Sequence, residues 1–399
     1  MNRLLNLLTL LLLSLASPAQ DLLVWPGVVE DAETGVRTQT GQKNALAHAL
    51  IVSEAGDEIQ IHGDLGHINL CVTGSAVGRN DVFRAEPIDA LIVGADSAVI
   101  HGIDAGARGG GYAYLGLRNL AIDARGRQVG ILGYMNSVLG VLDIEDCELL
   151  SDSKTKWGFR IHGWSDWLRF VNVTGWGGGQ EHLAYVDHTR GFNPENGLSV
   201  EVDGLRGAYW KRTLFQGVTR KHSGGPGSPA RPAAPGSLLI ANSYAKDCGA
   251  HGAFNYTVAG WPEGTVTFRD NRGESKHPTG LFAGYRDWKQ EDLLNPDGFA
   301  IDHLIWAHNV GIYPHGDREV NEIGSVGRLE VRVGDINSAF NLSPNRGMDF
   351  AGAGVPCGVI ELQSRVDPNT WNWQMPQPFL MDKTALAPDE VRELWFIPR

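Results

Sequence analysis

The chain has 399 residues, of which 51 are glycine and four are cysteine, and its formal net charge is −12. An acidic chain disfavours nucleic acid as a partner, because phosphate binding requires a basic face. No C-x-x-C or H-x-x-x-H spacing indicates a structural zinc site. The glycine content exceeds the ordinary share of about 7% and indicates many tight turns.

The first 19 residues have the three parts of a secretory signal peptide. A positive start at Arg3 is followed by an apolar stretch over residues 4–16, and small residues at 17–19 suit cleavage after Ala19. No later apolar run approaches the roughly 18 residues that a membrane-spanning helix needs. We therefore expect a secreted or periplasmic protein that does not insert into a membrane.

Residues 20–40 are expected to form an extended lead-in, and residues 41–55 a short helix. Leu46 and Leu50 give this helix an apolar stripe. The first expected strand, at residues 58–62, follows at once. An amphipathic helix in this position suits an element that covers one end of a core.

From residue 130 to residue 205 the sequence repeats a couplet of two short strands, with turns rich in Gly, Asn and Asp. The second strands alternate strictly, as Leu198, Val200 and Val202 do against the polar residues between them. A period of two means that one face of the strand is buried and the other is wet. Short strands of this kind, without helical spacing between them, are typical of a solenoid of stacked coils.

The couplet recurs about every 30 residues, with second strands starting at positions such as Leu120 and Leu142. We therefore predict an all-β fold, a single-domain parallel β-helix solenoid of about 11 coils over residues 41–365. The Gly- and Pro-rich stretch 223–236 cannot join a ladder and is expected to protrude as a loop. Residues 366–399 lack the alternation and are expected to cap the other end.

One motif is more specific than the repeat. Glu181, His182 and Tyr185 form EH-x-x-Y, and a Lys-Arg-Thr run at 211–213 follows. With the coils, this motif resembles the right-handed parallel β-helix proteins of the pectate-lyase-like superfamily, over residues 41–365. The resemblance implies a right-handed β-helix preceded by a helix, and many functions occupy that fold.

Alternation in the first strands of the couplets predicts which side chains face solvent. Residues such as Phe159 and Ala184 should point inward, so that their successors form two outward rows. Arg212 or Gln216 should take the rung after Tyr185. The first row is Leu132, Arg160, Tyr185, Asn255, Phe282, Tyr313 and Asn341, and the second includes His162, Asp187 and Thr257.

Five residues of this face are candidate catalytic residues. Successive rungs lie roughly 4.8 Å apart, so His162 should neighbour Asp187, with Arg160 and Tyr185 beside them. A carboxylate can orient a histidine base, a tyrosine can transfer a proton, and Arg160 or Arg212 can neutralise a substrate carboxylate. Base, acid and cation together are what β-elimination from a uronic-acid sugar needs.

A second group of residues is predicted to bind the substrate. Aromatic rings on the flanking turns can stack on sugars, and polar side chains beside them can hold hydroxyl or carboxylate groups. The same rings can equally stack on one another along the solenoid. The group comprises Trp164, Trp176, Glu181, His182, His188 and Lys211.

The expected partner is a polysaccharide, and the leading hypothesis is a polysaccharide lyase that acts as a monomer. One alternative is a non-enzymatic glycan-binding or envelope adhesion protein. The other is a glycoside hydrolase, which needs two carboxylates about 5–9 Å apart. For that role Asp187 has possible partners such as Glu181.

No cofactor or metal is expected, although an acidic run at Asp143, Glu145 and Asp146 is a weak candidate for Ca²⁺, and a solvated face explains it equally well. The four cysteines are widely spaced, at 71, 147, 248 and 357. Coils more than one rung apart hold Cα atoms beyond disulfide reach, so free thiols are predicted.

Overall fold

The computed structural model describes residues 21–41, 45–71, 81–83, 86–105, 111–133, 139–162, 167–187, 198–219, 236–249, 254–258, 261–275, 281–284, 301–307, 309–313, 318–319, 321–323, 326–333, 340–341, 359–364 and 394–398. The predicted signal peptide, residues 223–235 of the predicted loop and most of the tail 366–399 lie outside these residues. In the part of the chain so described, no helix is long and apolar enough to cross a membrane.

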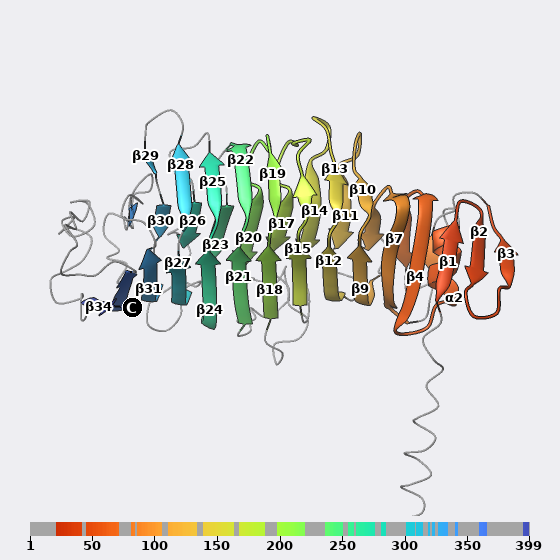
Figure 1. The fold of residues 1–399 in the computed structure, drawn as a ribbon, viewed down its shortest axis with the longest axis horizontal. Helices are drawn as coiled ribbons and strands as arrows, with labels where there is room; N and C mark the ends of the chain where they lie inside the picture. The colour runs from red at the N-terminus through yellow and green to blue at the C-terminus, as the bar shows by residue number, and fades with distance from the viewer. Residues whose placement is uncertain are drawn as a thin grey trace, which may run out of the picture.

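The described chain is a parallel β-solenoid, in which strands of successive coils stack along one long axis (Figure 1). Each central coil contains three strands, for example β12 (Leu139–Glu145), β13 (Glu148–Leu150) and β14 (Trp157–His162). Like-placed strands of successive coils pair in parallel and form three ladders, which we call ladders I, II and III in the order in which the chain meets them. The sequence predicted two strands per coil, so the short middle strand is a correction.

Ladder I contains the longest strands and runs nearly the whole length of the solenoid. It begins with β1, which pairs in parallel with β4 and antiparallel with β2, and β2 pairs antiparallel with β3. Its strands are β1 (Leu22–Trp25), β4 (Asp57–Asp64), β7 (Ile88–Ile100), β9 (Tyr112–Arg118), β12, β15 (Trp167–Val171), β18 (Leu198–Asp203), β21 (Gly236–Ala241), β24 (Trp261–Arg269), β27 (Ile301–Ala307), β31 (Val326–Val333), β33 (Val359–Ser364) and β34 (Leu394–Pro398), with β2 (Val28–Asp31) and β3 (Arg37–Gln39) beyond β1.

Ladders II and III use shorter strands. Ladder II joins the end of β7 and comprises β10 (Ala121–Asp123), β13, β16 (Thr174–Gly175), β19 (Arg206–Ala208), β22 (Tyr244–Cys248), β25 (Arg272–Ser275) and β28 (Val310–Tyr313), with β29 (Arg318–Glu319) antiparallel to β28. Ladder III is a sheet of 11 described strands: β6 (Asp81–Phe83), β5 (Ile68–Cys71), β8 (Ile103–Ala105), β11 (Val129–Gly133), β14, β17 (Ala184–Asp187), β20 (Phe215–Thr219), β23 (Phe254–Val258), β26 (Leu281–Gly284), β30 (Asn321–Ile323) and β32 (Phe340–Asn341).

The core lies inside the ladders and follows from the alternation in the sequence. Val200 and Val202 of β18 are buried, whereas the residues between and after them are partly exposed, as predicted. Large side chains stack from rung to rung, as Phe268 and Trp306 do at 5.1 Å between ring centroids. Burial of such side chains contributes roughly 1.5–3 kcal/mol each, which is how a solenoid grows without a central globular core.

A column of residues with positive φ turns the chain from ladder I into ladder II. Asn119, Asp146 and Asn172 have φ between 50° and 53°, and each donates its backbone N–H to the last carbonyl of ladder I in the next coil, at 2.9–3.1 Å. Asn, Asp and Gly adopt this left-handed conformation at the least cost. The column continues with Gly204, Asn242 and Asp270.

Inside this corner, three polar side chains replace the apolar ones of earlier coils. Ser243, Asn271 and Asn309 are at most 2% exposed and form a row along the solenoid. The Ser243 backbone N–H donates to Asn271 Oδ1, and the Asn271 amide nitrogen donates to Asn309 Oδ1. The Asn271 amide nitrogen also donates to the Ile240 carbonyl at 2.8 Å. These side chains satisfy buried backbone groups that would otherwise lack a partner.

In the third coil, the second strand of the couplet was predicted to begin at Leu120, whereas the ladder I strand begins earlier, at Tyr112. Leu115 of β9, and not a strand beginning at Leu120, faces Leu142 in ladder I. Leu120 instead follows the corner residue Asn119 and points into the core. The apolar run continues through the corner, so alternation alone does not mark where the strand ends.

The two ends of the solenoid also have regular structure. The helix α2 (Ala45–Val52) forms within the segment predicted to be helical, and its Leu46 and Leu50 are fully buried. β34 adds to β33 in parallel, so the tail expected to lack alternation supplies one more strand of ladder I. The handedness of the coil, the number of coils and the capping role of α2 remain predictions.

Candidate functional site

The outer face of ladder III brings together the residues that the sequence predicted as neighbours. Arg160 of β14 lies opposite Tyr185 of β17, and His162 lies opposite Asp187. Tyr185 in turn faces Gln216 of β20, so Gln216 takes this rung and the alternative choice, Arg212, does not. The Arg160 and Tyr185 side chains are partly exposed on the outer face, and their predecessors Phe159 and Ala184 are fully buried, as predicted.

Arg160 is held between two side chains of its own strand. Its Nε donates a hydrogen bond to Nε2 of His162 at 2.8 Å, and its guanidinium carbon lies 4.2 Å from the centroid of the Trp157 ring. The cation–π contact and the hydrogen bond fix the guanidinium over the strand. Nε2 of His162 is thus unprotonated, and its lone pair accepts a hydrogen bond from a permanent cation. An unprotonated ring nitrogen is the atom that a histidine general base uses.

Tyr185 lies between two histidine rings. Its ring centroid is 5.6 Å from that of His162 and 5.4 Å from that of His182. His182 is only 3% exposed, and its Nδ1 accepts a hydrogen bond from the Thr213 backbone N–H at 3.3 Å and contacts Thr213 Oγ1 at 2.7 Å. A backbone N–H can only donate, so Nδ1 is the acceptor and the proton of the neutral ring is on Nε2.

The burial of His182 changes the role that suits it. The sequence suggested a side chain held over the surface that could bind substrate, whereas the ring lies beneath the surface against Tyr185. Thr213 and Gln216, neither of them among the predicted site residues, complete this buried polar layer, and Gln216 is 7% exposed. His182 is suited to orient the tyrosine, much as buried partners orient metal-site or catalytic side chains.

No protein-family model, curated protein or solved structure matches this chain. A parallel β-solenoid hosts many functions, so we argue function from the side chains of the site.

The turn that precedes ladder III holds an ion pair. Arg212 Nε lies 2.6 Å from Glu181 Oε2, on neighbouring coils, and the Arg212 side chain is about half exposed. Lys211 beside it is exposed. Glu181 is thus already bound to a cation, which makes it a poor second carboxylate for hydrolysis.

The remaining predicted residues are not gathered at His162. The Trp176 ring packs 6.2 Å from Tyr244 of ladder II, and not beside the His162 rung as the sequence suggested. Trp164 and His188 lie outside the described residues, and of Asp187 only the backbone is described. Trp157, which contacts Arg160, was not among the predicted site residues.

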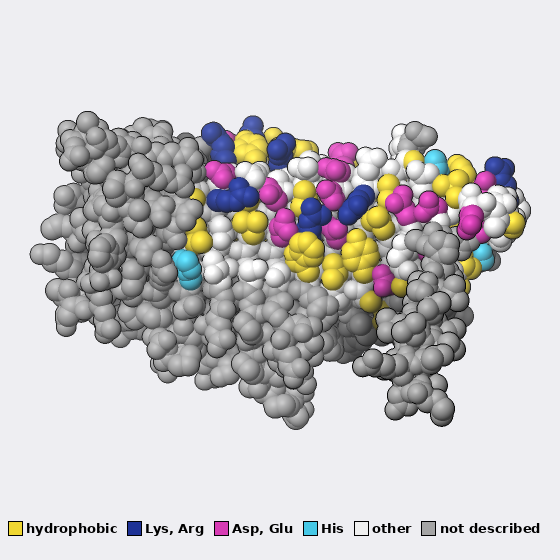
Figure 2. All heavy atoms as spheres, turned by 60° about the horizontal axis from the view of Figure 1, so that its bottom comes forward, with side chains coloured by type: hydrophobic (Ala, Val, Ile, Leu, Met, Phe, Trp, Pro, Cys, Tyr) yellow, Lys and Arg dark blue, Asp and Glu magenta, His cyan; other side chains and the backbone are white. Residues whose placement is uncertain are grey.

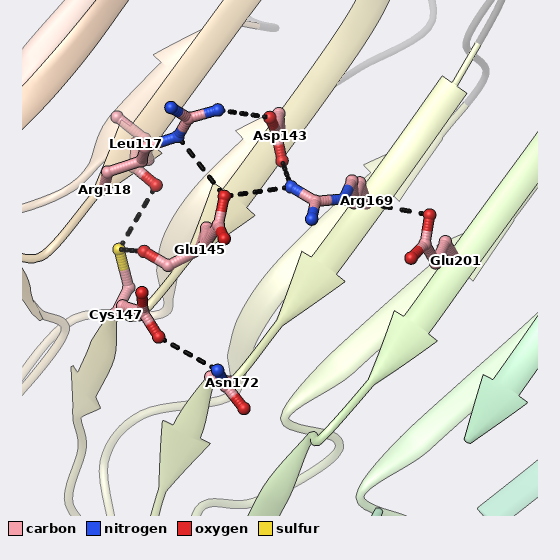
Figure 3. A network of polar contacts seen from close by, with 9 residues as sticks. Leu117, Arg118, Asp143, Glu145, Cys147, Arg169, Asn172 and Glu201 are labelled. Atoms are coloured by element: carbon pink, nitrogen blue, oxygen red, sulfur yellow. Dashed lines mark hydrogen bonds and ion pairs between the residues drawn. The ribbon is translucent and has the colours of Figure 1, made fainter. Parts of the chain in front are cut away.

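The acidic run on ladder I is occupied by arginines. Asp143 and Glu145 both contact Arg118 and Arg169, at 2.8–3.5 Å, and Arg169 reaches on to Glu201 at 3.7 Å (Figure 3). Figure 2 shows the resulting mixture of acidic and basic side chains along this face. Among the residues that the structure describes, no group of three or more His, Cys, Asp or Glu side chains is placed to hold a metal ion.

Two of the four cysteines are described with their side chains. Cys147 and Cys248 are both buried, and neither forms a disulfide, as predicted. Cys147 lies at the corner column and its thiol contacts the Leu117 carbonyl at 3.4 Å (Figure 3).

Proposed function

We propose that the protein is a carbohydrate-active, right-handed parallel β-helix protein of the pectate-lyase-like kind, exported from the cytoplasm. In this proposal it binds a uronic-acid polysaccharide along the outer face of ladder III and cleaves it by β-elimination. The observation that supports it best is the Arg160–His162 hydrogen bond beside Tyr185. A cation, a base and a hydroxyl thereby share two adjacent strands.

The proposed step begins when the substrate carboxylate binds Arg160. Arginine binds carboxylates with two parallel hydrogen bonds, so the guanidinium turns toward the substrate and releases Nε2 of His162. The same interaction stabilises the negative charge that develops when the proton α to the carboxylate leaves.

Nε2 of His162 then takes that α-proton, and the electron pair forms a double bond to the β-carbon. The bond from the β-carbon to the glycosidic oxygen breaks, and the Tyr185 hydroxyl donates its proton to this oxygen. The products are a reducing-end sugar and an unsaturated uronate, and the step consumes no co-reactant. His182, buried against Tyr185, positions the phenol and does not touch the substrate.

The test is a screen of uronic-acid polysaccharides for the ultraviolet absorbance of the unsaturated product. We expect His162→Ala and Tyr185→Phe to lower the rate by about a hundredfold or more, the range typical of a lost general acid or base. Their melting temperatures should stay close to that of the wild type, because a partly exposed outward side chain buries little apolar area. His101→Ala and Tyr114→Phe are matched controls.

These controls change a histidine and a tyrosine away from the cluster, and both should cleave like the wild type. A wild-type protein that forms no unsaturated product from any polyuronate contradicts the lyase proposal. A His162→Ala protein that cleaves at the wild-type rate contradicts the assignment of the site.

A second candidate is a glycan-binding protein without catalytic activity. Contacts within the cluster favour this candidate, because its polar side chains already bind one another: Arg160 contacts His162 and Trp157, and His182 contacts Thr213. In that case Arg160→Ala should weaken binding of acidic glycans on an array, while no preparation releases product.

A further inference from the structure

Ladder II carries exposed aromatic and basic side chains that the proposed cleavage site does not use. They lie on or next to the neighbouring strands β16, β19 and β22. Trp176 and Tyr209 are 42% and 57% exposed, high values for aromatic rings. We call this set the aromatic–basic patch; its members are Trp176, Arg206, Tyr209, Tyr244 and Lys246.

The backbone pairing holds the patch together. Arg206 lies opposite Tyr244 in the ladder, and the backbone N–H of Tyr209 donates to the Lys246 carbonyl at 3.1 Å. The Trp176 and Tyr244 rings lie 6.2 Å apart at an angle of 53°. Three consecutive coils therefore contribute to one continuous surface.

The two cations of the patch form no ion pair with a described residue, although the Tyr244 hydroxyl of the patch donates a hydrogen bond to Glu274 Oε1 at 3.3 Å. Among the described residues neither Arg206 nor Lys246 has an ion-pair partner, whereas Arg272 on the next strand binds Glu274 at 2.9 Å. On a chain with net charge −12, unpaired cations beside exposed rings mark a place suited to an anionic ligand.

Tyr209 adds an independent observation, because its backbone is strained. Its φ is +64°, and it belongs to a column in which the neighbouring coils have Gly178 at +74° and Asp247 at +52°. Gly and Asp adopt this conformation readily, whereas a bulky side chain in it is a genuine outlier. The exposed ring gains little burial in return, so stability does not account for a tyrosine here, and strain of this kind concentrates at ligand-binding positions.

We propose that the aromatic–basic patch is a second binding surface for an acidic polysaccharide, on a different ladder from the cleavage site. The Trp176 and Tyr209 rings stack on sugar faces, and Arg206 and Lys246 bind carboxylates of the same chain. The choice of a polyuronate as the ligand rests on the proposed function, whereas the patch itself rests on the exposed rings, the unpaired cations and the strained tyrosine.

The test measures binding of polygalacturonate and alginate, with uncharged dextran for comparison, by affinity electrophoresis and calorimetry. We expect Trp176→Ala and Tyr209→Asn each to weaken polyuronate binding about tenfold, the equivalent of losing one good stacking contact. Arg206→Gln should weaken it and reduce its dependence on salt. Arg125→Gln removes an exposed arginine that is paired with Asp123 of β10, away from the patch; it is the matched control and should bind like the wild type.

Two features keep the result interpretable. Tyr209→Asn relieves backbone strain, so it should melt no earlier than the wild type and any loss of binding is not a loss of folding. His162→Ala should retain patch binding, and Trp176→Ala should cleave short oligouronates normally if the proposed lyase activity is correct.

The outcomes separate the two proposals. Weaker binding by the Trp176 and Tyr209 variants supports the patch even if the wild type releases no unsaturated product, a result that contradicts only the proposed cleavage. Wild-type affinity in both variants, or no polyuronate binding by the wild type, overturns the patch.

Discussion

The hydrogen bonds of Asn271, in the buried polar row with Ser243 and Asn309, allow the stability cost of a substitution to be predicted. Asn271 is 1% exposed, and its amide nitrogen donates to both the Ile240 carbonyl and Asn309 Oδ1 at 2.8 Å. Its Oδ1 accepts the Ser243 backbone N–H at 3.1 Å. An Asn271→Leu substitution keeps the number and branching of the side-chain heavy atoms and removes all three bonds.

The substitution leaves the Ser243 N–H and the Ile240 carbonyl buried without these partners. Each buried group deprived of its hydrogen bond costs about 1–3 kcal/mol, and the added apolar burial of leucine offsets about 1–2 kcal/mol of that. We therefore expect the free energy of unfolding to fall by about 2–4 kcal/mol.

Equilibrium unfolding in urea, followed by tryptophan fluorescence, measures the change. The control is Asn242→Gly at the exposed corner column, where φ is 48° and the side chain bonds Asp203 Oδ1 at 2.7 Å. Glycine suits this backbone, so the control should change stability by about 0.5 kcal/mol or less. If Asn271→Leu unfolds at the same urea concentration as the control, the hydrogen bonds of the buried polar row do not stabilise the solenoid.

Three further predictions concern other buried groups. Arg169→Met leaves Asp143, whose side chain is 8% exposed, with Arg118 as its one remaining cation among the described residues. Calorimetry should therefore show that the free energy of unfolding falls by about 2–4 kcal/mol, and an unchanged melting temperature would contradict this. Burial raises the pKa of the Cys147 thiol to about 12, so a thiol reagent at pH 8 should label this residue only after unfolding without reductant, and labelling of folded protein there would be against it. Burial also lowers the pKa of His67 below its usual 6.5, so just below pH 6.5 the unfolded chain binds a proton at this residue and the folded chain does not. The free energy of unfolding should therefore fall as the pH drops below about 6.5. His67→Gln should make this pH dependence weaker, and a variant with the wild-type pH profile would contradict the prediction.

The sequence predicted ladder III best, because its inward and outward residues differ sharply in character. In β14 the order Phe159, Arg160, Ile161, His162 allows one register only, and the pairing with β17 is the predicted one. In the C-terminal coils the sequence pattern predicts the register less well. Tyr313, predicted for the same outward row, belongs to β28 of ladder II, and Glu322 takes its rung.

Ladder II was missed because its strands are too short to show a period. β13 has three residues and β16 has two, and a window of that size carries no alternation. The usable signal was the Asn or Asp that ends the ladder I strand, at positions such as 119, 146 and 172, because these residues favour the left-handed corner. The ring of Trp176 could not be assigned to a face for the same reason.

The packing of His182 could not be predicted from the motif. EH-x-x-Y places a histidine three residues before a tyrosine, but whether the ring lies above or below the surface depends on the next coil. There Thr213 supplies both a backbone N–H and a hydroxyl to one ring nitrogen. Such a pairing joins residues 31 positions apart and leaves no trace in local spacing.

The reversal of chain direction at β1, β2 and β3 has a consequence for self-association. A parallel ladder that stopped at β4 would offer a second molecule a long row of unpaired N–H and C=O groups, the template on which fibres grow. Among the residues that the structure describes, the last strand at that end is β3, three exposed residues long, and its Arg37 is paired with Glu30 at 2.6 Å. A second copy that approached this end would meet a short strand that carries a charged residue. The strands β1, β2 and β3 therefore disfavour end-to-end polymerisation at this end of the solenoid.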